Sequence, residues 1–218
     1  LFLAPRELVA KAPFSGQAAF VYDPANPVPT LGGNNLYLSA GPYDQRGLES
    51  RSDVLVFSSQ VLSEPLEITG PVSVLLSASS SARDTDWTAK LCDVYPDGRS
   101  MMMLDGLRRA KFRQGFEEAV LLEPGQPVEV EIELGSTALV FNTGHRIRLT
   151  VSSSNSPRFE PNPNTGLPWS EEVEQEIQSA TNTVYFNSGS KLILPVVSPD
   201  SHPLFQSATA SDQAIMAY

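Results

Sequence analysis

The chain has 218 residues, enough to bury a substantial core, and its 25 acidic against 15 basic residues give a formal charge of −10. This balance argues against nucleic acid or an anionic membrane as a partner, because phosphate binding needs clustered Lys and Arg. A single cysteine, Cys92, excludes an internal disulfide and a cysteine-based metal cage, and no apolar run approaches the ~20 residues of a membrane span.

The N-terminal stretch, LFLAPRELVAKAPF, has no starting Met and no signal-peptide architecture. We therefore expect residues 1–13 to be an arm left from an upstream domain, and the chain to be a piece of a longer protein. Residues 22–33, YDPANPVPTLGG, are a Pro- and Gly-locked extended segment that cannot be a central strand. Residues 41–57, GPYDQRGLESRSDVLVF, combine charges with a tight turn ahead of a strand.

Short β-rich segments occupy most of the remaining chain. Residues 128–134, VEVEIEL, alternate strictly between apolar residues and glutamates, which is typical of a strand with one wet face. Residues 145–151, HRIRLTV, alternate in the same way. The other predicted strands are 53–57, 66–70, 72–78, 87–95, 107–112, 137–141, 183–186 and 191–197. Cys92, within TAKLCDVY, is interpreted as a small buried hydrophobe rather than a reactive thiol.

Turn signals separate these strands, and the signal Pro96-Asp97-Gly98 predicts a hairpin turn between two strands. The signals are Pro65, Gly70-Pro71, Pro96-Asp97-Gly98, Asp105-Gly106, Pro124-Gly125 and Thr143-Gly144. About ten short strands predict an all-β jelly-roll sandwich, galactose-binding-domain-like, with one or two short helices. One helix is predicted over 170–180, SEEVEQEIQSA, capped by Ser170. We expect one domain over 14–197 and a tail over 198–218.

The stretch 144–159, GHRIRLTVSSSNSPRF, places a histidine beside a run of hydroxyls and raises the question of a serine–histidine catalytic site. The chain has no G-x-S-x-G elbow and no alternating βα pattern to display one. His145 lies on the apolar face of its predicted strand, where a packed ring bonded to backbone or a carboxylate is favoured. The serines are interpreted as strand and corner, so we predict no catalytic residue.

Four aspartates in DTDWTAKLCDVYPDG could supply oxygen ligands to calcium: Asp84, Asp86, Asp93 and Asp97. They do not follow a calcium-loop spacing, and turn-forming or strand-capping roles are favoured. We therefore predict no metal site and no cofactor. Residues 162–166, NPNTG, have Asn and Gly at positions suited to left-handed backbone.

Several segments together resemble the C-terminal non-catalytic domain of X-Pro dipeptidyl-peptidase and cocaine-esterase-like (CocE/NonD) hydrolases. They are, in order, YDPANPVPTLGG, GPYDQR, SRSDVLVFSS, DTDWTAKLCDVYPDGRS, DGLRRAKFR, GHRIRLTVSSSNSPRF and NPNTG. The resemblance covers residues 14–197. It implies a jelly-roll domain behind an α/β-hydrolase domain and a helical cap, which are the expected partners in the same polypeptide. The serine, acid and histidine of the triad would lie upstream, and the parent would cleave an ester or amide through an acyl-enzyme.

The resemblance also implies a role for the segment after PVPTLGG, which runs along the boundary with the catalytic domain in similar enzymes. Leu36 and Tyr37 are therefore predicted to line the acyl side of the substrate pocket. The chain departs from relatives in length between Gly33 and Gly41, and Ser156 stands where an aromatic residue is common.

The charged run Asp44, Arg46, Glu49, Arg51 and Asp53 is predicted to organise the sandwich edge or an interdomain contact through Arg–carboxylate pairs. Homo-oligomer contacts are a further expectation. An alternative function is an independent carbohydrate- or ligand-binding module, with Trp87, Trp169 or Tyr43 as a platform. The parent's substrate is not specified by these residues, and the lack of disulfides leaves the compartment open, with the cytoplasm slightly favoured.

Overall fold

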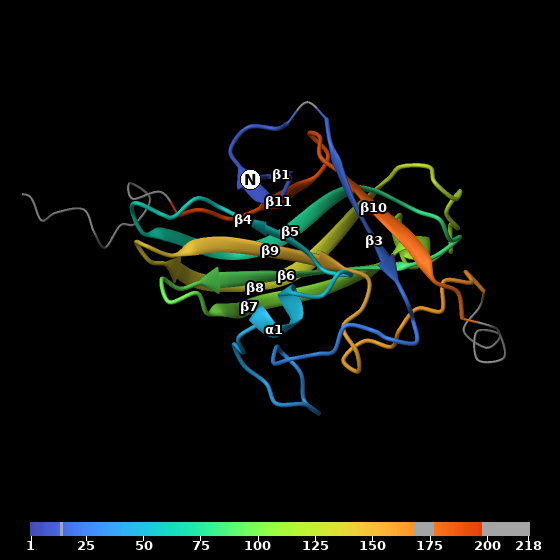
Figure 1. Cartoon of the computed structure of the whole chain (residues 1–218), viewed down its shortest axis with the longest axis horizontal. Helices are drawn as coiled ribbons and strands as arrows, with labels where there is room; N and C mark the ends of the chain where they lie inside the picture. The colour runs from blue at the N-terminus through green and yellow to red at the C-terminus, as the bar shows by residue number, and fades with distance from the viewer. Residues whose placement is uncertain (14, 168–176, 198–218) are drawn as a thin grey trace, which may run out of the picture.

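The computed structural model describes residues 1–13, 15–167 and 177–197, and it is built almost entirely of strands (Figure 1). The strands are β1 (Phe2–Ala4), β2 (Glu7–Val9), β3 (Gln17–Tyr22), β4 (Leu55–Ser58), β5 (Leu66–Ser80), β6 (Asp86–Val94), β7 (Ser100–Arg109), β8 (Val128–Phe141), β9 (Arg146–Ser152), β10 (Ala180–Tyr185) and β11 (Lys191–Ile193). The helices are α1 (Arg46–Glu49) and a 3₁₀ turn, η1 (Ala110–Phe112). None of the described helices has the length and apolar character needed to cross a membrane.

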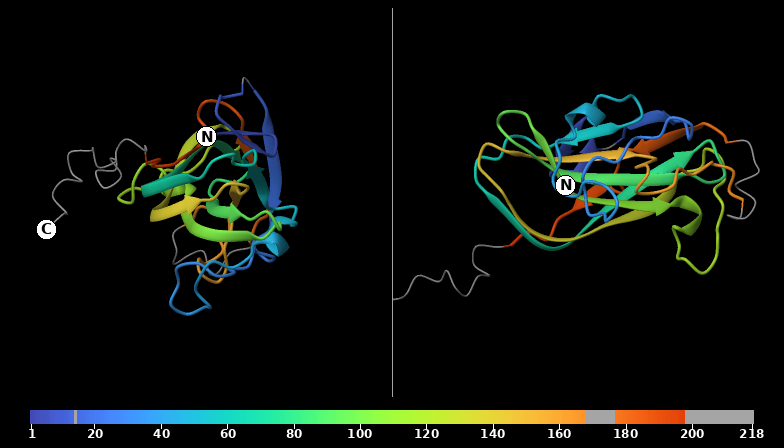
Figure 2. Two further views of the ribbon diagram at one scale, coloured as in Figure 1. Left: turned by 90° about the vertical axis from the view of Figure 1, so that its left-hand side faces the viewer. Right: turned by 90° about the horizontal axis from the view of Figure 1, so that it is seen from below.

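The strands follow one continuous hydrogen-bonded path, β3-β10-β5-β11-β1-β2-β4-β9-β6-β7, with β8 paired to β5. The path folds back on itself, because β8 packs against β6 and β7 without pairing with them. Seen from below, the strands of the two halves therefore run in two layers (Figure 2). The predicted all-β sandwich is confirmed.

The alternation in the sequence determines which face of each strand is buried. In β8, Val130 and Ile132 are fully buried and the intervening glutamates are exposed, as predicted. In β6 every residue is buried, since β7 and β9 flank the strand and β8 covers its face. The side chains of Leu91, Ile132 and Leu149 meet in one core between the layers.

Two turns predicted from the sequence are wrong, because their residues lie inside strands. Gly70-Pro71 falls within β5, and Asp105-Gly106 falls within β7. At Gly106 a Cβ atom would overlap the carbonyl oxygen of Glu133, so glycine is required there by the close approach of β7 to β8 rather than by a turn. The predicted strand 107–112 is also corrected, because β7 ends at Arg109 and η1 follows. The hairpin turn at 96–98 is confirmed between β6 and β7.

The N-terminal residues form two short strands that join the sheet. β1 pairs with β11 and with β2, and Leu3 is fully buried. β2 in turn bridges to β4 at Ser58. Most of the predicted helix 170–180 lies outside the described residues; Ile177 to Ser179 are described without helix, and Ala180 begins β10. The boundaries 1–13, 14–197 and 198–218 stay a prediction.

Candidate interdomain surface

A closed loop precedes α1 and projects below the sandwich in Figure 1. Its ends meet at Gly33 and Gly41, whose backbones exchange two hydrogen bonds of 2.8 and 3.1 Å. Both glycines have positive φ, +92° and +122°, which side-chain-bearing residues rarely adopt. Within the loop, the Asn35 Oδ1 accepts from the Leu38 backbone N–H at 2.7 Å. The Gly33–Gly41 loop is therefore held in one shape by its own bonds.

The tip of this loop presents two large apolar side chains to solvent. Leu36 is 93% exposed and Tyr37 is 97% exposed. These are the two residues that the sequence predicts to line the substrate pocket. Adjacent exposed apolar and aromatic side chains on a pinned loop are typical of a contact surface, because Tyr and Leu gain free energy when another surface covers them.

Gly33, at the base of the loop, lies close to a partly buried ion pair. A Cβ at Gly33 would lie 3.0 Å from the Arg158 Nη1 atom. That Nη1 donates to the Asp105 Oδ1 at 2.6 Å, and the Asn155 Nδ2 donates to the other carboxylate oxygen at 2.9 Å. Asp105 belongs to β7, and the other two residues follow β9. The ion pair thus joins β7 to the segment after β9, and Gly33 packs closely beside it.

The predicted Arg–carboxylate pairs are present beside the loop. Arg46 reaches Asp44 at 2.6 Å, and this hydrogen bond is the main reason that the pKa of Asp44 lies below its usual range. Arg51 binds Asp53 through two bonds of 2.8 Å. Glu49 points inward instead.

Glu49 joins α1 to the sheet behind it. Its Oε2 accepts from Arg148 on β9 at 2.6 Å, and its Oε1 accepts from the Ser100 hydroxyl on β7 at 2.5 Å. Its side chain is only 8% exposed. The bonds of Glu49 to Arg148 and Ser100 therefore hold α1 against the sheet.

A cavity of about 410 Å³ lies beside α1, between the edges of β3 and β4. Its floor includes Phe57 and Phe186, whose rings pack edge to face with centroids 5.8 Å apart. Arg6 and Arg51 lie among its walls. The surface around the loop and α1 therefore combines apolar groups with charged side chains.

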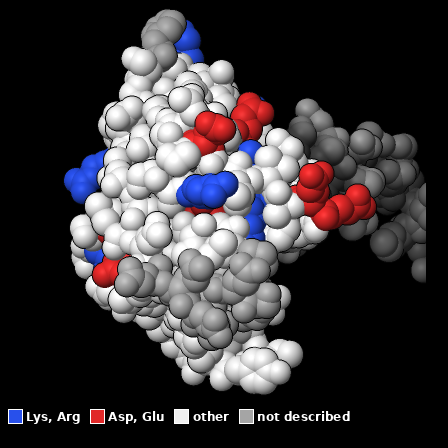
Figure 3. All heavy atoms as spheres, turned by 90° about the vertical axis from the view of Figure 1, so that its right-hand side faces the viewer, with Lys and Arg blue, Asp and Glu red and all other residues white. Residues whose placement is uncertain are grey.

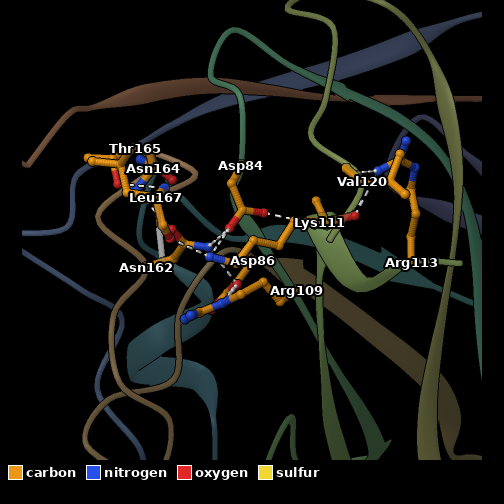
Figure 4. A network of polar contacts seen from close by, with 11 residues as sticks. Asp84, Asp86, Arg109, Lys111, Arg113, Val120, Asn162, Asn164, Thr165 and Leu167 are labelled. Atoms are coloured by element: carbon orange, nitrogen blue, oxygen red, sulfur yellow. Dashed lines mark hydrogen bonds and ion pairs between the residues drawn. The ribbon is translucent and has the colours of Figure 1, made fainter. Parts of the chain in front are cut away.

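A second polar cluster, shown in Figure 4, lies at the N-terminal end of β6 and has a structural role. The Asn162 Nδ2 donates to Asp84 at 3.1 Å and to Asp86 at 2.8 Å, and Arg109 donates to Asp86 at 2.9 Å. Burial raises the pKa of both carboxyl groups, against the opposing effect of these donors. Asn164, in the same 162–166 segment, has a φ of +65°, which confirms the predicted left-handed position.

Of the four aspartates considered for calcium, Asp84 and Asp86 share Asn162, and the other two have partners elsewhere. Asp93 bonds His145, and Asp97 pairs with Arg99 at 2.7 Å. Within the part of the chain that the structure describes, no three His, Cys, Asp or Glu side chains gather as metal ligands would.

His145 packs as the sequence predicts. Its Nδ1 lies 2.9 Å from the Asp93 Oδ1, and its ring lies against Tyr95 with centroids 4.5 Å apart. The nearby serines bond elsewhere: the Ser152 hydroxyl lies 2.6 Å from the Thr88 hydroxyl, and the Ser154 hydroxyl accepts from a backbone N–H. The stretch is strand and corner.

Two further interpretations concern the buried core. Cys92 is fully buried, and burial raises the pKa of its thiol to about 12, as expected for a hydrophobe rather than a nucleophile. Trp87 is also fully buried, so it cannot serve as a sugar platform. Tyr43 is 41% exposed, and Trp169 lies outside the described residues.

Charges on the face seen in Figure 3 are of both signs, with Lys and Arg interspersed among Asp and Glu and most of the visible surface uncharged. The acidic balance of the whole chain is therefore not gathered into one patch on this face.

The sequence did not predict the buried side chains behind the loop, Gln45, Lys90, Asp105 and Asn155, or the partly buried Arg158. One signal was present. A lysine in the middle of a continuous predicted strand, TAKLCDVY, must be buried if that strand is central in a sheet, and it then needs a polar partner.

The chain is similar in sequence and in fold to known hydrolases. Residues 1–193 match the family described as the X-Pro dipeptidyl-peptidase C-terminal non-catalytic domain. The cocaine esterase of Rhodococcus sp. (strain MB1 Bresler) is 50% identical over 149 residues, which are 67% of this chain and 26% of the esterase. An aminopeptidase structure from a marine sediment Thaumarchaeota archaeon superposes with a TM-score of 0.75 at 30% identity, covering 88% of this chain and 34% of that protein.

An α-amino acid ester hydrolase structure is similar to the same extent, with a TM-score of 0.73 at 30% identity over 88% of this chain and 34% of that one. The chain thus spans about a quarter to a third of the length of these relatives, which are complete esterases and peptidases. From its sequence and its fold, the chain belongs to the family of C-terminal non-catalytic domains of X-Pro dipeptidyl-peptidases.

Proposed function

We propose that the chain is the accessory β-sandwich domain of a serine hydrolase that cleaves esters or amides, and that the Gly33–Gly41 loop is part of its contact with the catalytic domain. The observation that carries this proposal is the pair Leu36 and Tyr37, both more than nine-tenths exposed on a loop that is closed by its own hydrogen bonds. The relatives, in which the domain is one part of a larger hydrolase, support it.

The free energy favours burial of this tip in the longer polypeptide. Covering one Leu or Tyr side chain stabilises a contact by about 1.5–3 kcal/mol. The closed loop loses little conformational entropy when it docks, since its shape is already fixed by the bonds of Gly33, Asn35 and Gly41. A pre-formed apolar tip is therefore suited to pack against a neighbouring domain.

The charged groups beside the loop fit the margin of the same contact. Interfaces commonly have an apolar centre and a polar rim. Arg46 is half exposed and already oriented by Asp44, and Arg51 is oriented by Asp53. In this proposal the arginines set the orientation of the two domains, and the tip provides most of the binding free energy.

The proposed contribution to catalysis is the shape of the substrate pocket. The nucleophile, acid and histidine would come from the upstream domain, as the resemblance implies. Leu36 and Tyr37 would form the apolar wall that receives the acyl group and excludes water from it. Contacts between copies of the protein stay a prediction from the sequence.

The test uses the full-length polypeptide and a chromogenic ester whose acyl chain is long enough to contact the wall, 4-nitrophenyl butyrate. Leu36→Ala with Tyr37→Ala is expected to lower kcat/KM by roughly 10- to 100-fold, which corresponds to about 1.4–2.7 kcal/mol of lost contact. Thermal stability of the sandwich should not change, because these side chains are almost fully exposed in it. Val140→Ala, on an exposed position of β8, is the matched control. An unchanged kcat/KM in the double variant would contradict the proposal.

A further inference from the structure

Gln45 is a polar side chain buried at the junction between the projecting loop and the sheet. It is only 1% exposed, although the loop that precedes it carries the highly exposed Leu36 and Tyr37. It directly precedes α1, and its backbone N–H donates to the Ser100 carbonyl on β7 at 2.8 Å. A buried amide needs partners for two donor hydrogens and one acceptor oxygen.

The Gln45 amide finds those partners on both sides of the loop. Its Nε2 donates to the Leu31 carbonyl at 2.9 Å and to the Tyr43 carbonyl at 3.0 Å. Leu31 lies before the Gly33–Gly41 closure and Tyr43 lies after it. One side chain thus holds the two legs of the loop together, two residues below the glycine pair.

Lys90 fixes the direction of this amide. It lies in the middle of β6, is 6% exposed, and donates from Nζ to the Gln45 Oε1 at 3.1 Å. An ammonium group has donors only, so it requires the oxygen of the amide and repels the NH₂ end. The Nε2 atom must therefore point toward the two loop carbonyls. In this way β6, the fully buried strand of the sheet, sets the orientation of a group that acts on the surface loop.

We propose that Gln45, oriented by Lys90, is a positioning residue that holds the Gly33–Gly41 loop, and with it Leu36 and Tyr37, in the geometry that meets the substrate pocket. We call this pair the Gln45 clamp. The loop closure at Gly33 and Gly41 sets the shape of the tip, and the Gln45 clamp sets its direction relative to the sheet. The catalytic consequence rests on the proposed function, whereas the structural consequence does not.

The structural consequence is tested by hydrogen–deuterium exchange and mass spectrometry on the full-length polypeptide. Gln45→Ala is expected to speed exchange of the Gly33 and Gly41 amides about tenfold, because two bonds that restrain the legs are lost. Amides of β6 and β9 should stay protected and report that the domain is folded. Gln126→Ala, the same change at an exposed glutamine, should leave the loop unchanged.

Lys90→Met provides a second variant, which keeps the test decisive if Gln45→Ala does not fold. It fills the same space and leaves the amide free to turn, so a smaller increase in exchange at Gly33 and Gly41 is expected. Unchanged exchange at both glycines in the folded variants would overturn the clamp.

The catalytic consequence is tested by combining variants. If Gln45 acts through the tip, adding Gln45→Ala to Leu36→Ala with Tyr37→Ala should cause no further loss of kcat/KM, which a general structural defect would not reproduce. If the tip variant keeps full activity while exchange rises in Gln45→Ala, the proposed function fails and the clamp stands. If the tip variant loses activity and Gln45→Ala, with faster exchange, does not, the positioning role is overturned.

Discussion

Replacement of Asn162 by Ala tests the buried network at the end of β6 most sharply. Asn162 is fully buried, and its Nδ2 bridges the carboxylates of Asp84 and Asp86. Its Oδ1 also accepts from the Asn164 backbone N–H at 2.8 Å. The substitution removes all three bonds and leaves two buried carboxylates with one donor fewer each.

The magnitude follows from the bonds that are lost. A hydrogen bond to a charged group contributes about 1.5–3 kcal/mol, and the donors from Arg109 and the Lys111 backbone remain. We expect the free energy of unfolding to fall by about 4 kcal/mol, which lowers Tm by roughly 8–16 °C for a chain of this size. Urea unfolding monitored by circular dichroism measures the free energy, and thermal unfolding measures Tm.

A matched control is Asn26→Ala, since Asn26 is exposed and its side chain lies outside this network. It should change the free energy of unfolding by less than about 0.5 kcal/mol. Asn162→Asp keeps the shape but places a third carboxylate in the cluster. Its pKa should be raised in the folded state, so stability should recover as pH falls through that raised value. A loss below about 1 kcal/mol in Asn162→Ala would show that the Asn162 side-chain bonds contribute little to stability.

Three further predictions concern other parts of the fold. Gly106→Ala should lower the free energy of unfolding by about 2–3 kcal/mol, because its Cβ would overlap the Glu133 carbonyl oxygen. The control Gly47→Ala, in α1, places its Cβ in open space and should be neutral or slightly stabilising. Urea unfolding measures both variants, and equal effects would contradict the close approach at Gly106. The Cys92 thiol should stay unreactive toward Ellman's reagent at pH 8 in the native chain and react on denaturation, and rapid native labelling would disprove its burial. The Asp44 carboxyl should titrate by NMR below the usual Asp range, and Arg46→Ala should return its pKa toward that range. Because the folded pKa is lowered, the small contribution of this pair to stability is present above the ordinary Asp pKa and is lost as pH falls through the folded value. An identical titration of Asp44 in both proteins would contradict the pairing.

The strands with strict alternation could be predicted because a two-residue period states which face is buried. Residues 128–134 are the clearest case, and the hairpin turn at 96–98 is another. The first three strands were missed. β1 and β2 have three residues each, too few to show a period, and β3, QAAFVY, contains a continuous apolar run, AAFVY, without alternation. Glycine was ambiguous, since the same residue marks a turn at Gly98 and a close backbone approach at Gly106.

The buried polar clusters could not be predicted, because their members are distant in sequence. Asn162 meets Asp84 across 78 residues, and Lys90 meets Gln45 across 45. Only the folded sheet brings these groups together. Leu36 and Tyr37 were predicted from the family resemblance, and their exposure on a closed loop became visible only in the structure.

In the proposed function, another part of the longer polypeptide covers the tip of the Gly33–Gly41 loop. Hydroxyl-radical footprinting of Tyr37 tests it directly, comparing the full-length polypeptide with the 218-residue chain, where this side chain is 97% exposed. Phe116, which is 76% exposed and lies between η1 and β8, is the internal reference. We expect strong protection of Tyr37 in the full-length polypeptide, with Phe116 unchanged. Equal oxidation of Tyr37 in both proteins would contradict it.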